Sequence, residues 1–304
     1  MAAAGVAARR RQPGGVVSAL WLDNGLVRLG FVPEAGGRLL SFQFAGTELL
    51  WRNPRVTDGL TGDFRPNDGK MGDWVNYGGD KTWPAPQGWS GPAEWPGPPD
   101  PVLDSGPYTV DSIGHCVTMR SAPDPRTGLE LTRRFTVAGS GYTLELTATN
   151  VSRRRVRWAL WNVTQFPGGG EVFVALRDHP APVVDLVAGT RNPRYELVDG
   201  GARVPAQDVV GKLGFPGAAG SLAYERAGHR VTCTFPVVDA EYPDRGSPVE
   251  VWLEHPQPAP LADLGDLDPP AHIVECEVLG PLIELAPGDR TSLTIEVVAG
   301  SCHS

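Results

Sequence analysis

Two glutamates lie two residues apart in the stretch HIVECEVLGP, residues 272–281. In a β-strand, residues i and i+2 share one face, so Glu275 and Glu277 would point the same way. The residues around them would then face a core: Val274, Cys276 and Val278. A carboxylate on the concave face of a sheet is suited to act as a general base. The alternative is the exposed polar face of an amphipathic strand, which needs no chemistry.

A second candidate is the stretch NYGGDKTWPAPQGW, residues 76–89, whose glycines and prolines exclude a helix. A sugar presents C–H faces and a ring of hydroxyls, which aromatic rings and polar groups together can bind. We therefore expect a binding-site rim with tryptophan platforms and polar anchors: Trp83, Trp89, Trp95, Asn76, Asp80, Lys81 and Gln87. In the alternative, the tryptophans only fix a long loop to the core, and Asp80 and Lys81 form a solvated ion pair.

Two further stretches place polar residues where they could reach a site. In WALWNVTQF, residues 158–166, strand spacing puts Gln165 and Trp161 on one face. The opposite face would carry Asn162, Thr164 and Phe166. In EYPDRGSPVEVW, residues 241–252, a turn before a strand would hold Tyr242, Asp244 and Arg245. Polar residues in strands are often satisfied by their neighbours, so each stretch alone is a weak signal.

Metal-binding patterns are weak in this sequence. FRPNDGKMGDW, residues 64–74, offers oxygen ligands in Asn67, Asp68 and Asp73, but it lacks the spacing of a known calcium loop. The six histidines are scattered, and four widely separated cysteines show no CxxC pair. We therefore expect no bound metal and no cofactor, and we expect reduced cysteines in a cytoplasmic protein.

The elements that must position these residues are predicted to be strands. The 304 residues are 41% hydrophobic and include 38 glycines and 30 prolines, a composition typical of a core with many turns. Period-two patterns run through most of the chain from Val16, and no amphipathic helix of twelve residues is evident. We predict one all-β domain over residues 16–304, a large antiparallel β-sandwich, with an irregular region over about residues 53–107. Residues 1–15 are expected to be a disordered tail.

Charge and hydropathy exclude several classes of partner. The net charge of −8 argues against nucleic acid, which needs a basic face. No run approaches the roughly 18 apolar residues of a membrane span, and the arginines near the start make a poor signal peptide. The expected partner is a small molecule, and the oligomeric state is not predicted. Abundant Ala, Arg, Gly and Pro with only three lysines are typical of a GC-rich bacterial genome.

In order along the chain, GGRLLSFQFAGTELLW, NYGGDKTWPAPQGW, WNVTQ, YPDRGSPVEVW and ECEVLGPLIELAPGD resemble the galactose mutarotase-like superfamily, to which aldose 1-epimerases belong. Within the superfamily, the chain more closely resembles an uncharacterised bacterial branch that carries GGDKTWPAPQ, and the resemblance runs from about residue 20 to 298. It implies a β-supersandwich whose concave face binds a sugar. It places the catalytic base at Glu277, or at Glu275 if the register shifts by one pair. It also puts five side chains near the substrate: Arg38, Tyr77, Gln165, Tyr242 and Asp244.

Both histidines of the superfamily pattern are absent here. Gln165 stands near the position of the acid, and Tyr77 stands at that of the sugar-binding histidine. An amide cannot deliver a proton at neutral pH, so Lys81 or Tyr77 is the replacement acid that we consider. The resulting hypothesis is a cofactor-independent isomerase or epimerase acting on a sugar or sugar-like cyclic hemiacetal. The alternatives are a non-catalytic carbohydrate-binding protein, a diverged cyclase or isomerase for a non-sugar metabolite, and a structural role on a borrowed scaffold.

Overall fold

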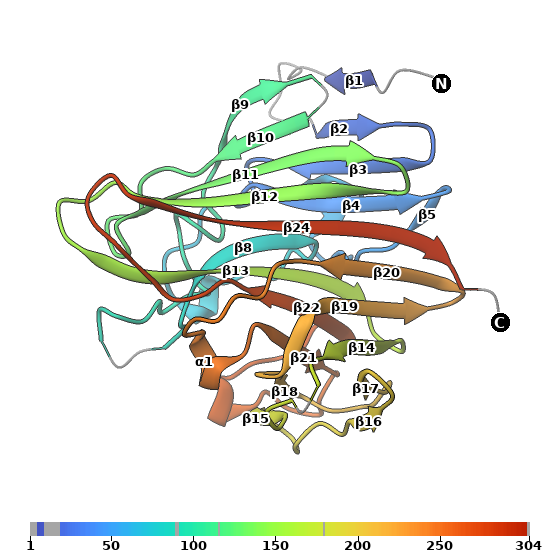
Figure 1. Ribbon diagram of the computed structural model, residues 1–304. Coiled ribbons are helices and arrows are strands. Elements are labelled where there is room, and N and C mark those ends of the chain that lie inside the picture. The colour runs from blue at the N-terminus through green and yellow to red at the C-terminus, as the bar shows by residue number, and fades with distance from the viewer. Residues whose placement is uncertain (1–4, 9–18, 89–90, 115, 179, 303–304) are drawn as a thin grey trace.

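The computed structural model describes residues 5–8, 19–88, 91–114, 116–178 and 180–302. Two large antiparallel sheets dominate it, and they stack face to face (Figure 1). The all-β expectation is confirmed, and the longest helix in the described part of the chain, α1 (Pro243–Gly246), has four residues. Two further short helical turns are η1 (Met71–Asp73) and η2 (Ala262–Leu264).

The first, 12-stranded sheet carries the predicted glutamates. Its main order is β1 (Gly5–Ala8), β2 (Leu20–Asp23), β3 (Val27–Val32), β4 (Arg38–Phe44), β8 (Asp80–Ala85), β13 (Val156–Pro167), β22 (Ile273–Leu279), β21 (Val249–Glu254), β18 (Gly211–Gly214) and β15 (Val184–Ala188). Two short strands pair beside this path: β5 (Thr47–Glu48) with β4, and β23 (Ile283–Leu285) with β13. We call it the first sheet.

The second, 10-stranded sheet covers one face of the first. Its order is β16 (Glu196–Val198), β17 (Gly201–Val204), β14 (Glu171–Leu176), β19 (Ala218–Arg226), β20 (His229–Thr234), β24 (Arg290–Ser301), β12 (Gly141–Asn150), β11 (Leu129–Ala138), β10 (Cys116–Arg120) and β9 (Thr109–Ile113). A small hairpin joins β6 (Thr57–Asp58) to β7 (Thr61–Gly62). Figure 1 shows β24, β12 and β11 in front of β3, β4 and β8.

The two sheets differ in how their strands are buried. Buried and exposed residues alternate along most of β24, as expected when one face meets a core and the other meets water. Every described residue of β8 and β22 is buried, so these central strands are covered on both faces. One hydrophobic cluster between the sheets contains side chains of both, such as Val274 and Cys276 from β22 and Leu144 from β12. On the outer face of the first sheet, turned away from the second, Trp83 of β8 contacts Trp95 and Asp104 of the connection that follows this strand.

Several elements differ from the sequence expectation. The region 53–107 was expected to be irregular, yet it contains β8 in the middle of the first sheet, between β4 and β13. Pro84 hid this strand, because proline is rare in central strands. Strands β15 to β18 were also not predicted. The tail was expected to be disordered, but Gly5–Ala8 pairs with β2, and the rest of residues 1–15 lies outside the described residues.

Two turns form where the local sequence favours them. Residues 138–141, AGSG, form the β11–β12 hairpin, with Ala138 paired to Gly141. Residues 286–289, Ala-Pro-Gly-Asp, also form a turn, in which the Asp289 amide donates to the carbonyl of Ala286 at 2.9 Å. This second turn does not connect a hairpin, because β23 pairs with β13 and β24 lies in the second sheet. It carries the chain from one sheet to the other.

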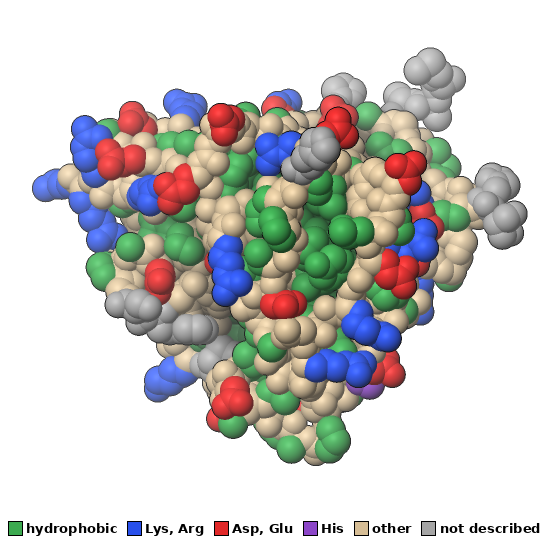
Figure 2. Space-filling view, turned by 60° about the horizontal axis from the view of Figure 1, so that its bottom comes forward, with side chains coloured by type: hydrophobic (Ala, Val, Ile, Leu, Met, Phe, Trp, Pro, Cys, Tyr) green, Lys and Arg blue, Asp and Glu red, His purple; other side chains and the backbone are tan. Residues whose placement is uncertain are grey.

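The surface is mixed in character. Figure 2 shows a face on which hydrophobic side chains gather in a central area, with acidic and basic side chains interspersed around it. Within the described part of the chain, no helix combines the length and the apolar character that crossing a bilayer requires.

Candidate functional site

The outer face of the first sheet carries a concentration of charged side chains. The strands β8, β13, β22, β21 and β18 are consecutive neighbours, and the register aligns Gln165 with Glu275, Glu275 with Trp252, and Trp252 with Lys212. Because side chains alternate between the two faces of a strand, the residues two positions before and after these lie on the same face of the sheet. We call the set the glutamate–lysine cluster: Lys81, Trp161, Gln165, Lys212, Glu250, Trp252, Glu254, Glu275 and Glu277.

One half of the cluster is organised around Glu275. Its Oε1 accepts hydrogen bonds from Lys81 Nζ at 3.2 Å and from Gln165 Nε2 at 2.5 Å. Lys81 is almost fully buried and lies 4.3 Å from the ring centroid of Trp83, which is also favourable for a cation. The Glu275 side chain keeps 11% of its surface exposed, whereas those of Glu250 and Glu277 have none. Glu275 is therefore the more accessible of the two predicted bases.

The other half is organised around Lys212, which lies between two carboxylates. Lys212 Nζ is 2.5 Å from Glu250 Oε2 and 2.8 Å from Glu277 Oε2. Glu277 Oε2 also accepts a hydrogen bond from Trp161 Nε1 at 2.6 Å. Burial alone would lower the pKa of Lys212, but the charges of Glu250 and Glu277 outweigh it and raise the pKa, so this lysine stays protonated.

The cluster holds more carboxylates than its lysines can neutralise. Burial is the main cause that raises the pKa of Glu277, and it raises that of Glu250 well above its ordinary value, although Lys212 opposes both shifts. Burial and the nearby charge of Glu275 raise the pKa of Glu254 to about 7. Four buried acceptor oxygens of the cluster have no hydrogen-bond partner among the described residues: Gln165 Oε1, Glu250 Oε1, Glu254 Oε2 and Glu277 Oε1. Since an unpartnered buried carboxylate oxygen is costly, the cluster favours retained protons.

Asp80, a predicted substrate anchor, points to the opposite side of the sheet. Its carboxylate lies between the sheets, where it is ion-paired with Arg133 of β11. Asn162 Nδ2 and Thr164 Oγ1 donate to its Oδ2 at 2.7 and 2.6 Å. The alternative of a solvated Asp80–Lys81 ion pair is wrong, because both residues are buried and each is paired with a different residue. The predicted shared face of Asn162, Thr164 and Phe166 is confirmed.

Arg38 and Trp83, also predicted to bind substrate, contact the connection that follows β8. Arg38 Nη2 donates to Asp104 Oδ1 at 2.5 Å, and Trp83 Nε1 donates to the same oxygen at 3.1 Å. Trp83 and Trp95 pack against each other with centroids 5.2 Å apart, and both are almost completely buried. The expected stacking platform is therefore not open at these two rings, and they fasten the connection to the core instead. Trp89 lies outside the described residues.

The remaining predicted anchors are dispersed. Tyr77 is buried, and its hydroxyl donates to the Asp63 carbonyl at 3.4 Å. The Gln87 amide donates to the Gly97 carbonyl within the same connection. Tyr242 is buried and accepts from the Val238 amide at 3.1 Å. Asp244 has a left-handed φ of 49° in α1, and its charge contributes to the raised pKa of Glu250, so it lies near that end of the cluster.

Sequence reasoning missed part of the cluster although a signal was present. The strand VEVWLE places Glu250, Trp252 and Glu254 at period two on one face, the same pattern that singled out Glu275 and Glu277. Lys212 belongs to a short strand that was not predicted, so nothing in its local sequence pointed to the cluster. Trp252 is half-buried and lies directly opposite Glu275, where it can offer part of its ring to a ligand.

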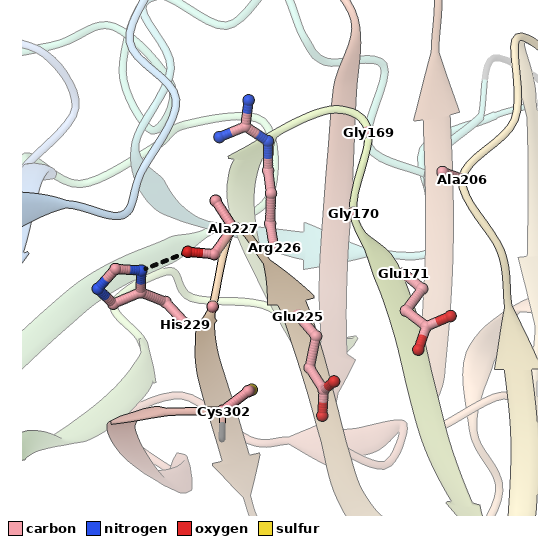
Figure 3. Close-up of a pocket in the computed structure, with 10 residues that line it drawn as sticks. Gly169, Gly170, Glu171, Ala206, Glu225, Arg226, Ala227, His229 and Cys302 are labelled. Carbon is pink, nitrogen blue, oxygen red and sulfur yellow. Dashed lines mark hydrogen bonds between the residues drawn. The ribbon is translucent and has the colours of Figure 1, made fainter. Parts of the chain in front are cut away.

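Two cavities lie elsewhere on the described surface. One, of about 440 Å³, is walled by the connection that precedes β8 and by the connection between β21 and β22. Its lining residues are 53, 55–56, 72, 74–76, 265–268 and 270. Asn76, a predicted anchor, lines it. The other, of about 370 Å³, is shown in Figure 3 at the β19–β20 hairpin. In this second cavity Glu171 is ion-paired with Arg203, and Glu225 with Arg230. His229 Nδ1 contacts the Ala227 carbonyl. None of the predicted site residues lines this cavity.

Solved structures share this architecture at low sequence identity. A galactose mutarotase-like protein from Lactobacillus casei ATCC 334 has 13% identity and a TM-score of 0.58, and the match covers 93% of this chain and 100% of that one. A candidate aldose 1-epimerase from Escherichia coli K12 has 14% identity and a TM-score of 0.62, with 93% and 99% covered. A TPR-domain containing protein from Parabacteroides distasonis ATCC 8503 has 13% identity and a TM-score of 0.63, with 95% and 48% covered, so this chain spans about half of its length.

These likenesses concern the fold, and they confirm that the chain has a galactose mutarotase-like β-sandwich. No curated protein matches the sequence. A family model described as a domain of unknown function, DUF4380, matches residues 17–296, and the chain therefore belongs to that family.

Proposed function

We propose that this protein is a cofactor-independent isomerase that moves protons on a sugar or sugar-like cyclic hemiacetal at the glutamate–lysine cluster. The observation that carries the proposal is Glu275, a partly exposed carboxylate beside a set of buried, proton-retaining glutamates. Its Oε1 is engaged by Lys81 and Gln165, which leaves Oε2 for a ligand hydroxyl. Solved proteins of the same fold include a galactose mutarotase-like protein, which supports a sugar as the ligand.

In this mechanism Glu275 accepts the proton of the anomeric hydroxyl. The electrons of that O–H bond form the aldehyde, the ring C–O bond breaks, and the ring oxygen takes up a proton. Glu254 is the group placed to hold that second proton, because its pKa of about 7 leaves it partly protonated at neutral pH. Ring closure after rotation reverses the transfers and gives the other anomer. Proton transfer alone needs no cofactor.

The proposed acid differs from the two that the sequence predicts, whereas the proposed base is one of its two candidates. The sequence predicts Glu277, or Glu275, as the base and Lys81 or Tyr77 as the acid. Glu277 is fully buried, and its Oε2 is held by Lys212 and Trp161. Lys81 donates to Glu275 Oε1 and so holds that carboxylate in place. In the proposal, Lys81 and Glu277 therefore position the cluster, and Glu275 contacts the ligand.

The test is proton NMR exchange spectroscopy of a panel of aldoses and sugar phosphates with and without the protein. We expect faster exchange between anomers, and a loss of roughly 100-fold or more in the Glu275→Gln variant. Glu296→Gln, on an exposed position of β24, is the matched control and should keep the full rate. Equal rates in the two variants, with both folded by circular dichroism, would remove Glu275 as the base.

A second candidate function is sugar binding without catalysis. It is favoured by Gln165, which stands where the superfamily resemblance expects the acid and which donates to Glu275. None of the described histidines belongs to the cluster. Line broadening of a sugar by the protein, without faster anomer exchange, would select this function. No effect on any sugar would contradict both candidates and would favour a non-sugar ligand.

A further inference from the structure

Two histidines and an aspartate meet just beyond the ends of β21 and β22. His255 follows β21 and His272 precedes β22, next to the last cross-strand pair of Glu254 with Ile273. Asp208 reaches them from the connection between β17 and β18. One possible ligand atom from each of the three residues lies within 4.8 Å of the others, and His255 Nε2 is 3.4 Å from Asp208 Oδ1. They lie far apart in the sequence, so spacing alone could not reveal the group.

Each imidazole is oriented by the backbone. His255 Nδ1 lies 3.1 Å from the Pro256 carbonyl, which leaves Nε2 toward Asp208. His272 forms a hydrogen bond with the backbone of Gln207, the neighbour of Asp208. A histidine that binds a metal commonly uses its second nitrogen in this way, because the backbone contact fixes the tautomer and the ring orientation.

Packing also fixes the ring of His272. The amide of Gly168 donates to the His272 carbonyl at 2.7 Å, and a Cβ at residue 168 would lie 2.2 Å from the imidazole. Only glycine leaves room for the ring in this position.

We propose that Asp208, His255 and His272 form a three-ligand site for a divalent transition metal, with zinc as the best match. Two imidazoles and one carboxylate are a common zinc set, with a fourth position open to water. Tetrahedral ligands about 2.1 Å from zinc lie roughly 3.4 Å apart, which agrees with the separation of His255 Nε2 and Asp208 Oδ1. The exposed Asp208 carboxylate can rotate to complete the set.

The site has a structural consequence that does not depend on the proposed isomerase activity. His255 and His272 bracket the connection of residues 256–271, so a shared metal would join the two ends of that connection. Residues 265–268 and 270 of the same connection wall the cavity of about 440 Å³. Bound metal would therefore hold one wall of that cavity in place. This proposal departs from the sequence expectation that no metal binds.

The test uses the untagged full chain, stripped with chelator and titrated with Zn²⁺ by calorimetry. We expect one zinc per chain, a raised Tm on binding, and a tetrahedral absorption spectrum when Co²⁺ is substituted. Affinity should fall roughly 100-fold or more in His272→Gln, and roughly tenfold or more in Asp208→Asn. Because Asp208 is exposed, Asp208→Asn tests the site even if the histidine variant does not fold. His229→Gln is the matched histidine control and should bind as the unaltered chain does.

Two results would overturn the proposal. One is the absence of saturable Zn²⁺ or Co²⁺ binding by the unaltered chain. The other is a Zn²⁺ affinity in Asp208→Asn and His272→Gln equal to that of His229→Gln, which would place bound metal elsewhere. In either case the three side chains would form only an edge-to-face imidazole pair beside a carboxylate.

Discussion

The Glu254 carboxyl combines deep burial, one hydrogen bond from Trp252 Nε1 at 3.0 Å, and a second oxygen with no partner. Its neighbour Glu275 differs because Lys81 and Gln165 donate to it. Two carboxyls on adjacent strands thus have unlike surroundings, and this difference is what acid–base chemistry requires.

The pKa of about 7 for Glu254 predicts a pH dependence of stability. Because this folded-state pKa lies above that of an unfolded glutamate, about 4.3, the folded chain holds an extra proton between these values. The associated stability is fully present below about pH 4.3 and is lost as the pH rises through 7. Urea unfolding should therefore compare the free energies of unfolding of Glu254→Gln and the unaltered chain at two pH values. The difference in favour of Glu254→Gln should be larger at pH 8 than at pH 4 by on the order of 2–3 kcal/mol. The same comparison with Glu296→Gln should show no such gain.

At the scale of elements, β8 is the central strand that sequence patterns missed. It begins directly after Gly79, whose φ is +77°, and all six of its residues are buried. Period-two alternation between polar and apolar residues identifies strands with one wet face, such as β24 and β12, and those were predicted. It did not identify β8, where Pro84 interrupts the pattern and polar residues such as Lys81 and Asp80 are paired rather than solvated.

The close approach at Gly79 gives a prediction for this element. A Cβ there would lie 2.4 Å from the Leu39 carbonyl oxygen, in addition to the strain of a positive φ. Gly69 has a similar φ of +81°, but a Cβ at residue 69 would meet no atom within 4 Å. Gly69→Ala should destabilise the protein by about 1 kcal/mol, from backbone strain alone. Gly79→Ala should lose clearly more in chemical unfolding, and equal losses would show that β4 can move aside.

In the candidate site, the sequence predicts which face of a strand a side chain occupies. The shared face of Glu275 and Glu277 follows from spacing in one strand, and so does the opposite face of Asn162. The meeting of Lys212 with Glu250 and Glu277 depends on which strands become neighbours, which one strand's sequence does not encode. The burial of Trp83 and Trp95 likewise depends on the connection that follows β8, which contributes Asp104. Side-chain orientation was predictable, whereas partners contributed by other strands were not.

At the scale of the whole molecule, the Asp80–Arg133 ion pair links the two sheets. Arg133 is fully buried on β11, and its guanidinium also donates to the Gly37 carbonyl at 2.6 Å and to the Asp80 carbonyl at 3.1 Å. Together with Asn162 and Thr164, it satisfies the carboxylate of Asp80 from both sheets. The sandwich therefore contains a polar link within its otherwise apolar interior.

Removing one member of this link should be severe. Asp80→Ala leaves the Arg133 charge buried without a counterion, and we expect a loss of about 3–5 kcal/mol in the free energy of unfolding. Arg134→Met is the matched control, because Arg134 lies on the same strand but forms an exposed ion pair with Glu145. That variant should lose about 1 kcal/mol or less. Comparable losses in the two variants would mean that the buried link contributes little to the stability of the sandwich.

Asp80 and Lys81 are consecutive in the chain, yet they serve opposite faces of the same strand. Under the proposed function, a substitution at position 81 would alter what the cluster recognises while the contacts of Asp80 with the second sheet remain intact. New substrate preferences would then arise at Lys81 without a change in the link between the sheets. A one-residue insertion or deletion within β8 has the reverse effect, because it would exchange the two side chains and damage recognition and assembly together. Length variation should accordingly be confined to the connections on either side of this strand.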